Sequence, residues 1–312
     1  MLAIEIDGLT KEYRAGFRKT RVKQALNSLN LQVKTGEVFG LLGPNGAGKT
    51  TTLKILFRLI FPTSGTARIL GKELNDTSMH RQVGYLPEHP YFYEHLTPEE
   101  LLQYTGRLFG FGKRSARVRT EQLLERVGLK NSRNVPLRRF SKGMVQRAGI
   151  AQALINDPDV VFLDEPMSGL DPVGRREVRD LILQLREEGK TVFFSTHILS
   201  DAEALCDRVA ILNNGELQGC GELREILSLG ASTTELTLEN PSESILDELR
   251  PLVVSMVRTG DRVRLEIRDE ACIEKVLAMA LGAKAKVVSM NPVKMSLEDY
   301  FLSKVSAGSE VL

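Results

Sequence analysis

The feature that most constrains the fold is residues 38–60, where three patterns follow one another without a break. Residues 38–42 are almost entirely apolar, which is typical of a strand buried on both faces. The next segment, 43–50, reads Gly-Pro-Asn-Gly-Ala-Gly-Lys-Thr. Apolar residues then recur at helical spacing: Leu53, Leu56, Leu59 and Ile60. A buried strand, a glycine-rich turn and a helix in this order predict an α/β domain.

The glycine-rich segment has the spacing G-x-x-x-x-G-K-[ST], in which backbone N–H groups and a helix start surround a phosphate chain. A chance glycine-rich turn is the alternative, but here both the sequence and its context match. The Lys49 ammonium is predicted to neutralise phosphate charge, and the Thr50 hydroxyl to bind Mg²⁺. The predicted nucleotide-binding residues of this segment are Gly43, Pro44, Asn45, Gly46, Ala47, Gly48, Lys49, Thr50 and Thr51.

Two acidic residues follow a second buried strand. Residues 160–163 are apolar, and Asp164 and Glu165 come directly after them. An acid at the end of a strand beside a phosphate-binding loop supplies the second Mg²⁺ contact in nucleotide-hydrolysing folds. We therefore predict that Asp164 binds Mg²⁺ and that Glu165 orients or deprotonates the attacking water.

Other segments extend the α/β pattern. Residues 192–194 are a third buried strand, and the spacing of Ser200 and Glu203 predicts a capping box at the start of a helix. Residues 209–217 contain Asn213-Asn214-Gly215 and predict a hairpin. Alternating apolar residues near the N-terminus predict half-buried strands. The expected fold is α/β with a mainly parallel core sheet and an N-terminal antiparallel β subdomain.

Two further segments differ from this pattern in their composition and in the spacing of their apolar residues. Residues 98–153 are basic and helix-patterned, which predicts a helical insertion. Residues 235–239 and 262–267 alternate like strands, and 271–280 are helical in pattern, so a small C-terminal α+β domain is expected. The predicted domains are 1–228, with a helical subdomain at about 89–155, and 229–312.

Composition limits the class of protein. Of the 312 residues, 42% are hydrophobic and 26% charged, which is an ordinary globular balance. No apolar run approaches the 18 residues of a membrane span, the N-terminus lacks a signal peptide's apolar core, and the three cysteines form no C-x-x-C pair. We therefore expect a soluble, cytoplasmic protein with reduced thiols.

The formal net charge of +2 conceals a strongly basic segment. Residues 107–147 contain twelve Lys or Arg and only two acids, Glu121 and Glu125. Such a surface is either a solvated face or a contact for an anionic partner, such as phosphates or a protein apposed to a membrane.

Residues 140–147, Phe-Ser-Lys-Gly-Met-Val-Gln-Arg, lie between the two nucleotide motifs and resemble the signature motif of the ABC ATPases. The resemblance covers about residues 1–225 and is specific, because seven motifs occur in the family's order. It implies the P-loop NTPase fold of an ABC cassette. Four further positions match: Tyr13 at the aromatic that stacks on adenine, Glu88 at the Q-loop, residues 168–171 at the D-loop and His197 at the switch histidine.

The resemblance implies that two cassettes bind ATP and Mg²⁺ between them, head to tail, as a homodimer or as a heterodimer with a related cassette. Ser141 and the backbone of Gly143 would contact the γ-phosphate of the partner's ATP. His197 would reach the γ-phosphate and hold the hydrolytic geometry, and Glu88 would contribute an oxygen to Mg²⁺ during catalysis.

Three residues depart from the family pattern. Lys142 stands where Gly is common, and Met144 and Glu88 stand where Gln is common. Lys142 adds a charge near the triphosphate, Met144 removes a polar contact, and Glu88 adds a negative charge while keeping an oxygen for Mg²⁺. Because Glu165 and His197 are present, we expect the site to hydrolyse ATP.

A cassette without a membrane span implies integral membrane permease subunits as partners, and a location on the inner face of the cell membrane. Residues 296–302 resemble the accessory domain of prokaryotic export-type ATP-binding subunits, which favours export. The alternative is a soluble ABC ATPase with a non-transport role, such as regulation or a mechanical switch on a protein partner. Nucleic acid is not an expected partner, since a chromosome-maintenance ATPase would carry a long coiled coil and a ribosome-associated factor a second cassette.

Overall fold

The computed structural model describes residues 1–15, 21–228, 233–293 and 296–307. The chain forms two compact units, Met1–Leu223 with Lys304–Leu312, and Arg224–Ser303. Within the described ranges, no helix combines the length and the apolar character that crossing a membrane requires.

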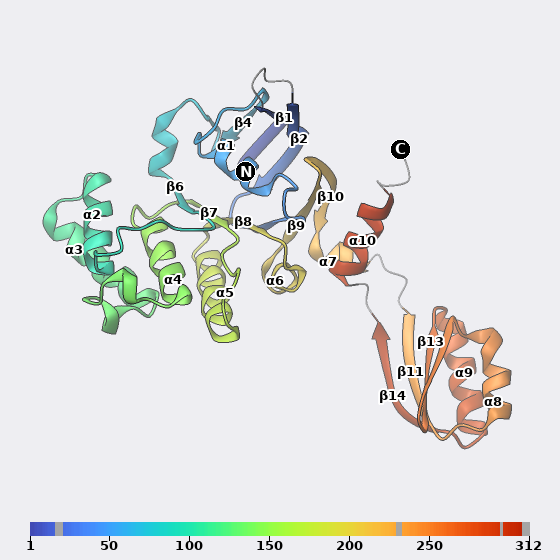
Figure 1. Cartoon of the computed structure of the whole chain (residues 1–312). Helices are drawn as coiled ribbons and strands as arrows, with labels where there is room; N and C mark the ends of the chain where they lie inside the picture. The colour runs from blue at the N-terminus through green and yellow to red at the C-terminus, as the bar shows by residue number, and fades with distance from the viewer. Residues whose placement is uncertain (16–20, 229–232, 294–295, 308–312) are drawn as a thin grey trace. The chain divides into compact units, whose positions relative to one another are not determined.

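The first unit is built on a six-stranded sheet of order β10-β9-β3-β8-β7-β6 (Figure 1). Five of its strands run parallel, and the Asn214-Gly215 hairpin adds β10 antiparallel to β9, as the sequence predicts. Its strands are β3 Val38–Leu42, β6 Val83–Leu86, β7 Val160–Asp164, β8 Thr191–Thr196, β9 Arg208–Asn213 and β10 Glu216–Glu222. Every residue of β3, β7 and β8 is buried, which explains their apolar sequences.

A second, antiparallel sheet of order β2-β1-β4-β5 flanks this core, with β1 and β2 before β3 in the chain and β4 and β5 after it. It confirms the expected N-terminal β subdomain, and Ile4 and Ile6 are buried where Asp7 is exposed. One apolar core joins the two sheets, with Ile4 and Leu31 in the same cluster as Phe39 and Phe162. The strands are β1 Leu2–Ala15, β2 Arg21–Lys34, β4 Ser64–Ile69 and β5 Lys72–Glu73.

A helical insertion is present, as the expected fold class requires. It contains α2 Pro98–Leu108, α3 Lys113–Arg126, α4 Lys142–Ala153 and two short 3-10 turns, Lys130–Ser132 and Leu137–Arg139. Thr97 and Glu100 form a reciprocal capping box at the start of α2. The remaining helices of the first unit are α1 Lys49–Leu56, the 3-10 turn Thr77–Arg81, and α5 Pro172–Glu187 and α6 Leu199–Leu205; α7 Leu223–Ser228 follows.

One predicted helix start is wrong. The sequence predicts a Ser200–Glu203 capping box, but α6 already begins at Leu199, and its N-cap is Ile198 with no side-chain cap. The Thr196 hydroxyl instead accepts a hydrogen bond from the Ile198 N–H at 3.0 Å, so the turn before the helix is closed by the end of β8.

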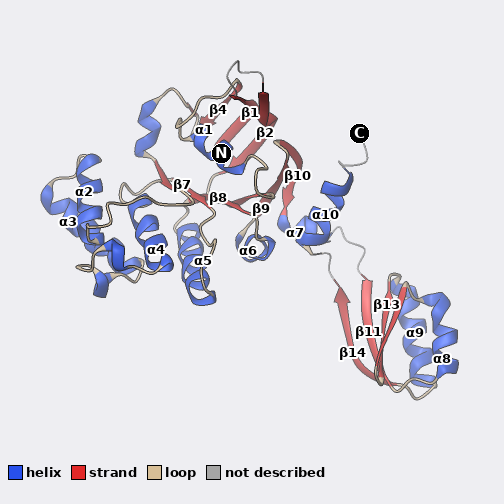
Figure 2. Cartoon of the chain, in the orientation of Figure 1, coloured by secondary structure: helices blue, strands red, loops and turns tan. Residues whose placement is uncertain are grey.

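The second unit is a four-stranded antiparallel sheet of order β12-β13-β11-β14, with α8 and α9 on one face (Figure 2). Leu236, Leu265 and Ile267 pack with helix residues such as Leu249 and Val276 in a separate core. The elements are β11 Thr233–Glu239, α8 Glu243–Leu249, the turn Arg250–Leu252, β12 Ser255–Thr259, β13 Arg262–Ile267, α9 Glu270–Gly282 and β14 Lys286–Val293. The last helix, α10 Leu297–Ala307, follows Ser296, whose Oγ accepts a hydrogen bond from the Asp299 N–H at 3.1 Å and whose own N–H donates to the Asp299 carboxylate at 3.1 Å.

Candidate nucleotide site

The parallel strands bring the sequence motifs to one edge of the core sheet. β3 ends at the glycine-rich loop, β7 ends at Asp164, and β8 ends just before His197. Since the carboxyl ends of parallel strands share an edge, these segments meet although more than 100 residues separate the loop from the acids. They border a cavity of about 400 Å³, lined by Tyr13, Lys23, Ala25, residues 45–51, Glu88 and Glu165.

The glycine-rich loop needs glycine for two reasons. Gly48 has φ of +112°, a conformation that side chains rarely adopt, and a Cβ there would lie 2.6 Å from the Ala25 carbonyl oxygen. A Cβ on Gly43 would lie 2.2 Å from the Leu212 carbonyl oxygen. The loop is therefore pressed between β2 and β9, and it leads into α1 with Gly48 as the N-cap residue. Backbone N–H groups at this helix start are suited to bind an anion.

Lys49 and Glu165 form a buried ion pair at the cavity. Their Nζ and Oε1 atoms are 3.2 Å apart, and each side chain is only 6% exposed. The ammonium also donates to the carbonyl oxygens of Gly43 at 2.7 Å and Pro44 at 3.2 Å. On its other side, Glu165 Oε2 lies 2.8 Å from His197 Nδ1. One carboxylate thus joins the predicted phosphate-binding lysine to the predicted switch histidine.

Asp164 is held by two hydroxyl groups. Ser195 Oγ donates to Asp164 Oδ1 at 2.6 Å, and Thr50 Oγ1 donates to the same oxygen at 3.3 Å. Burial raises the pKa of Asp164, and the negative charges of Glu88 and Glu165 raise it further, while the two hydroxyl hydrogen bonds lower it. A cation bound at this point would relieve the crowding of negative charge.

Glu165 has an unusual backbone conformation. Its φ of +49° lies in the left-handed region, which is uncommon for residues other than glycine. Its N–H donates to Ser195 Oγ at 3.0 Å and also lies 3.2 Å from the Ser195 carbonyl oxygen. A strained backbone conformation of this kind persists where surrounding contacts hold it in place. With this backbone conformation, the Glu165 carboxylate lies between Lys49 and His197.

Tyr13 and Glu88 also border the cavity. The Tyr13 ring is 40% exposed and has the Lys11 ammonium 5.3 Å from its centroid. An exposed aromatic ring at the cavity wall suits stacking on a nucleotide base. The Glu88 side chain is 42% exposed and its carboxylate is near enough to Asp164 to affect the pKa of that residue.

Ser141 and Gly143 are not among the residues that line this cavity. Ser141 is the N-cap of α4, where its Oγ accepts a hydrogen bond from the Met144 N–H at 3.3 Å. A Cβ on Gly143 would meet no atom within 4 Å, whereas a Cβ on Gly169 would lie 2.2 Å from Lys142 Nζ. The signature motif therefore presents an open helix start, and its lysine rests against the D-loop of the same chain.

Three residues of the site are not predicted from sequence. Lys23 and Ala25 line the cavity from β2, and no motif marks them. Ser195 is fully buried and contacts both acids, and its only sequence signal is that it is polar within the apolar run before His197.

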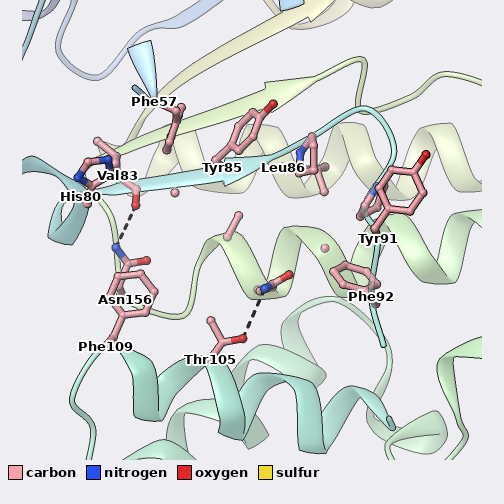
Figure 3. Close-up of a pocket in the computed structure, with 16 residues that line it drawn as sticks. Phe57, His80, Val83, Tyr85, Leu86, Tyr91, Phe92, Thr105, Phe109 and Asn156 are labelled. Atoms are coloured by element: carbon pink, nitrogen blue, oxygen red, sulfur yellow. Dashed lines mark hydrogen bonds between the residues drawn. The ribbon is translucent and has the colours of Figure 1, made fainter. Parts of the chain in front are cut away.

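A separate groove of about 360 Å³ lies between β6, α2 and α4 (Figure 3). Tyr85 stacks on Phe57 at a centroid distance of 4.5 Å, and Tyr91 is 93% exposed. Other aromatic rings along it are Phe92 and Phe109. Burial, and then the charges of Asp164 and Glu88, raise the pKa of Tyr85. Leu86 and Pro87 line the groove and Glu88 lines the nucleotide cavity, so consecutive residues at the end of β6 border both.

A glycine-rich loop around a buried lysine, with two acids and a histidine at the same sheet edge, defines a P-loop nucleoside triphosphatase. The family model described as ABC transporter matches residues 26–168, which include the glycine-rich loop, the signature motif and both acids.

Relatives match the chain over almost its whole length. An uncharacterized ABC transporter ATP-binding protein of Synechocystis is 44% identical, over 97% of this chain and 84% of the relative. The bacitracin transport ATP-binding protein of Enterococcus faecalis is 34% identical, over 98% and 97%. The daunorubicin/doxorubicin resistance ATP-binding protein of Streptomyces peucetius is 34% identical, over 96% and 92%. The chain therefore belongs to the ABC transporter ATP-binding proteins.

Solved structures agree with this assignment. An ATP-binding subunit of an ABC transporter is 34% identical, with a TM-score of 0.63 over 72% of this chain and 91% of that one. A dimeric cassette in a post-hydrolysis state, bound to ADP and Pi, is 29% identical, with a TM-score of 0.65 over 71% and 99%. The fold is that of an ABC ATPase, and the predicted fold class is confirmed.

Proposed function

We propose that this chain is the ATP-hydrolysing motor subunit of an exporter whose membrane permease is a separate protein. The observation that carries the proposed hydrolysis is the Lys49–Glu165–His197 chain of contacts beside the glycine-rich loop, in which the Lys49 and Glu165 side chains are buried and the His197 side chain is exposed. Proteins of this family are ATPases whose hydrolysis of ATP is coupled to transport. Export is inferred from relatives named for bacitracin transport and for daunorubicin/doxorubicin resistance.

The contacts suggest a role for each residue. In this structure the Lys49 ammonium contacts Glu165 and the carbonyl oxygens of Gly43 and Pro44. A bound γ-phosphate would bind the ammonium in place of Glu165. Glu165 would then be free to accept a proton from the attacking water. His197, whose Nδ1 contacts Glu165, would orient this carboxylate and the γ-phosphate. Tyr13 would stack on the adenine.

The residues around Asp164 suit Mg²⁺. Thr50 Oγ1 and Asp164 Oδ1 are hard oxygen donors 3.3 Å apart, and Glu88 supplies a third oxygen donor at the same cavity. The described residues contain no cluster of three or more His, Cys, Asp or Glu that would hold a metal by themselves. Mg²⁺ keeps several waters and binds through one or two protein oxygens together with phosphates, which the Thr50 and Asp164 oxygens could supply on the protein side.

Two cassettes are proposed to complete each site. Ser141 and Gly143 do not line the cavity of their own chain, yet they form an open helix start suited to an anion. They would therefore act on the ATP of a second cassette, in a homodimer or a heterodimer. A similar cassette has been solved as a dimer.

The groove between β6, α2 and α4 is the proposed contact for the permease. Its aromatic walls would hold an apolar segment, and the residues around Glu88 would transmit the contact to the nucleotide. We place the protein on the inner face of the membrane through this contact. Residues 1–228 would form the cassette, with the helical subdomain at about 89–155, and residues 229–312 the accessory domain.

The test uses a Glu165→Gln variant together with its permease. The variant should bind ATP and dimerise without turnover, and the wild-type ATPase should be stimulated by the permease in vesicles. Full ATPase activity in Glu165→Gln would refute the role of Glu165. ATPase activity that no membrane protein alters, with the protein found in soluble fractions throughout, would favour the non-transport alternative.

A further inference from the structure

The end of α2 and the first turns of α3 carry exposed cations and exposed apolar side chains within residues 108–118. At the end of α2, Leu108 is 69% exposed and Phe109 is 40% exposed. On α3, Val118 is 49% exposed. Lys113 and Arg114 form the first two positions of α3 and are exposed. We call these five residues the α2–α3 apex.

The cations of the apex are not neutralised by neighbours. Within the ranges that the structure covers, Lys113, Arg114 and the nearby Arg107 make no ion pair. Arg119, further along α3, does pair with Asp157 at 3.3 Å. The apex therefore keeps an uncompensated positive charge, unlike the far end of α3, where Arg126 pairs with Glu188.

The apolar side chains of the apex are also exposed. Phe111, Val118, Lys113 and Arg114 help to line an open depression of about 740 Å³ on this surface. Asp157 also lines it, and this acid pairs with Arg119. Exposed apolar groups that gather among cations mark an interaction surface and are uncommon on a fully solvated face.

The combination points to an anionic membrane surface. Guanidinium and ammonium groups would meet lipid phosphates, while Leu108, Phe109 and Val118 would enter the boundary between headgroups and acyl chains. Nucleic acid fits less well, because two of the three apolar residues of the apex, Leu108 and Val118, offer no ring for base stacking and gain nothing from phosphates.

We propose that the α2–α3 apex binds the headgroup region of anionic phospholipids directly. Phe109 also lines the groove proposed for the permease, so the two contacts would lie next to each other. This inference rests on the proposed function and adds a direct lipid contact to the proposed location at the membrane. Its test contains no permease, so the lipid contact and the proposed transport function can fail independently.

The experiment is co-sedimentation of the full chain with vesicles, of phosphatidylcholine alone or with phosphatidylglycerol added. Binding should require phosphatidylglycerol and should weaken at high salt. Each basic residue near such a surface contributes about a fivefold change in partitioning, so a Lys113→Glu/Arg114→Glu variant should lose at least about 25-fold. This variant should fold, because acidic residues at the start of α3 suit the helix dipole, and its basal ATPase should be unchanged.

The matched control is Lys275→Glu/Lys284→Glu, which makes the same charge change on exposed residues of the other unit. It should bind vesicles like the wild type. A Leu108→Ser/Val118→Ser variant should bind less without any change in charge.

Equal loss in both charge variants would show a general charge effect and overturn the proposal, as would the absence of vesicle binding. Vesicle binding that survives Lys113→Glu/Arg114→Glu, while assembly with the permease is lost, would make the apex a protein contact. Displacement of the vesicles by single-stranded RNA at equal phosphate would make it a nucleic-acid surface.

Discussion

Ser195→Ala tests the site at a residue that no sequence motif marks. The Ser195 hydroxyl is fully buried, donates to Asp164 at 2.6 Å and accepts from the Glu165 N–H at 3.0 Å. After the substitution the Glu165 N–H still has the Ser195 carbonyl oxygen at 3.2 Å. The Asp164 carboxylate keeps only the longer contact from Thr50. The loss is therefore one hydrogen bond to a buried charged group.

Such a bond contributes roughly 1.5–3 kcal/mol, so the free energy of unfolding should fall by about 2 kcal/mol. For a unit of this size that corresponds to a decrease in Tm of roughly 4–8 °C. The rate of ATP hydrolysis should fall by about 10–100-fold, because Asp164 is a proposed metal ligand and loss of the partner that orients a metal ligand has effects of that size. Differential scanning calorimetry without nucleotide and steady-state ATPase assays over a range of Mg²⁺ concentrations measure the two effects.

The control is Thr120→Val. The Thr120 hydroxyl is buried and has no hydrogen-bond partner among the described residues, so its removal should leave stability unchanged or raise it slightly. Its ATPase activity should equal that of the wild type. A Ser195→Ala enzyme with wild-type ATPase activity would refute the argument that Ser195 positions the two acids.

Three further substitutions follow from the structure. Gly48→Ala places a Cβ 2.6 Å from the Ala25 carbonyl oxygen at φ of +112°, so ATP binding measured by calorimetry should be lost, and normal affinity would contradict the loop geometry. Tyr13→Ala should weaken ATP binding about 5–100-fold and leave inorganic triphosphate binding unchanged, since only the base can stack; equal weakening of both would refute stacking. Glu99→Gln should lower Tm at pH 7, because Arg133 donates two hydrogen bonds that lower the pKa of Glu99. A carboxylate with a lowered pKa stabilises the fold above its ordinary value of 4.5, so the Tm difference should shrink as the pH falls below that value, and a pH-independent difference would exclude the ion pair as its cause.

The sequence predicts the buried strands well, because short runs of apolar residues are typical of strands that are buried on both faces. β3 coincides with its predicted segment, and β7 and β8 contain theirs, since parallel strands covered on both faces favour apolar side chains. β8 is longer than the predicted 192–194, because it also includes the buried polar residues Thr191, Ser195 and Thr196. β6 is an edge strand of four residues containing Gly84 and Tyr85, and α8 is a single short helix, so neither has enough periodicity to be predicted. The start of α6 is missed because Thr196, on the preceding strand, closes the turn that Ser200 is predicted to cap.

By itself the sequence determines the kind of chemistry, because the phosphate-binding loop, the acids and the signature segment depend on residues close together in the chain. Tertiary structure alone decides how these motifs contact one another. Lys49, Glu165 and His197 are joined in one line of contacts, and Ser195 holds Asp164, only because β3, β7 and β8 are parallel neighbours. The exposed apex of α2 and α3 is likewise decided only by the tertiary structure. Charge and hydrophobicity along the chain do not reveal which side chains remain exposed after packing.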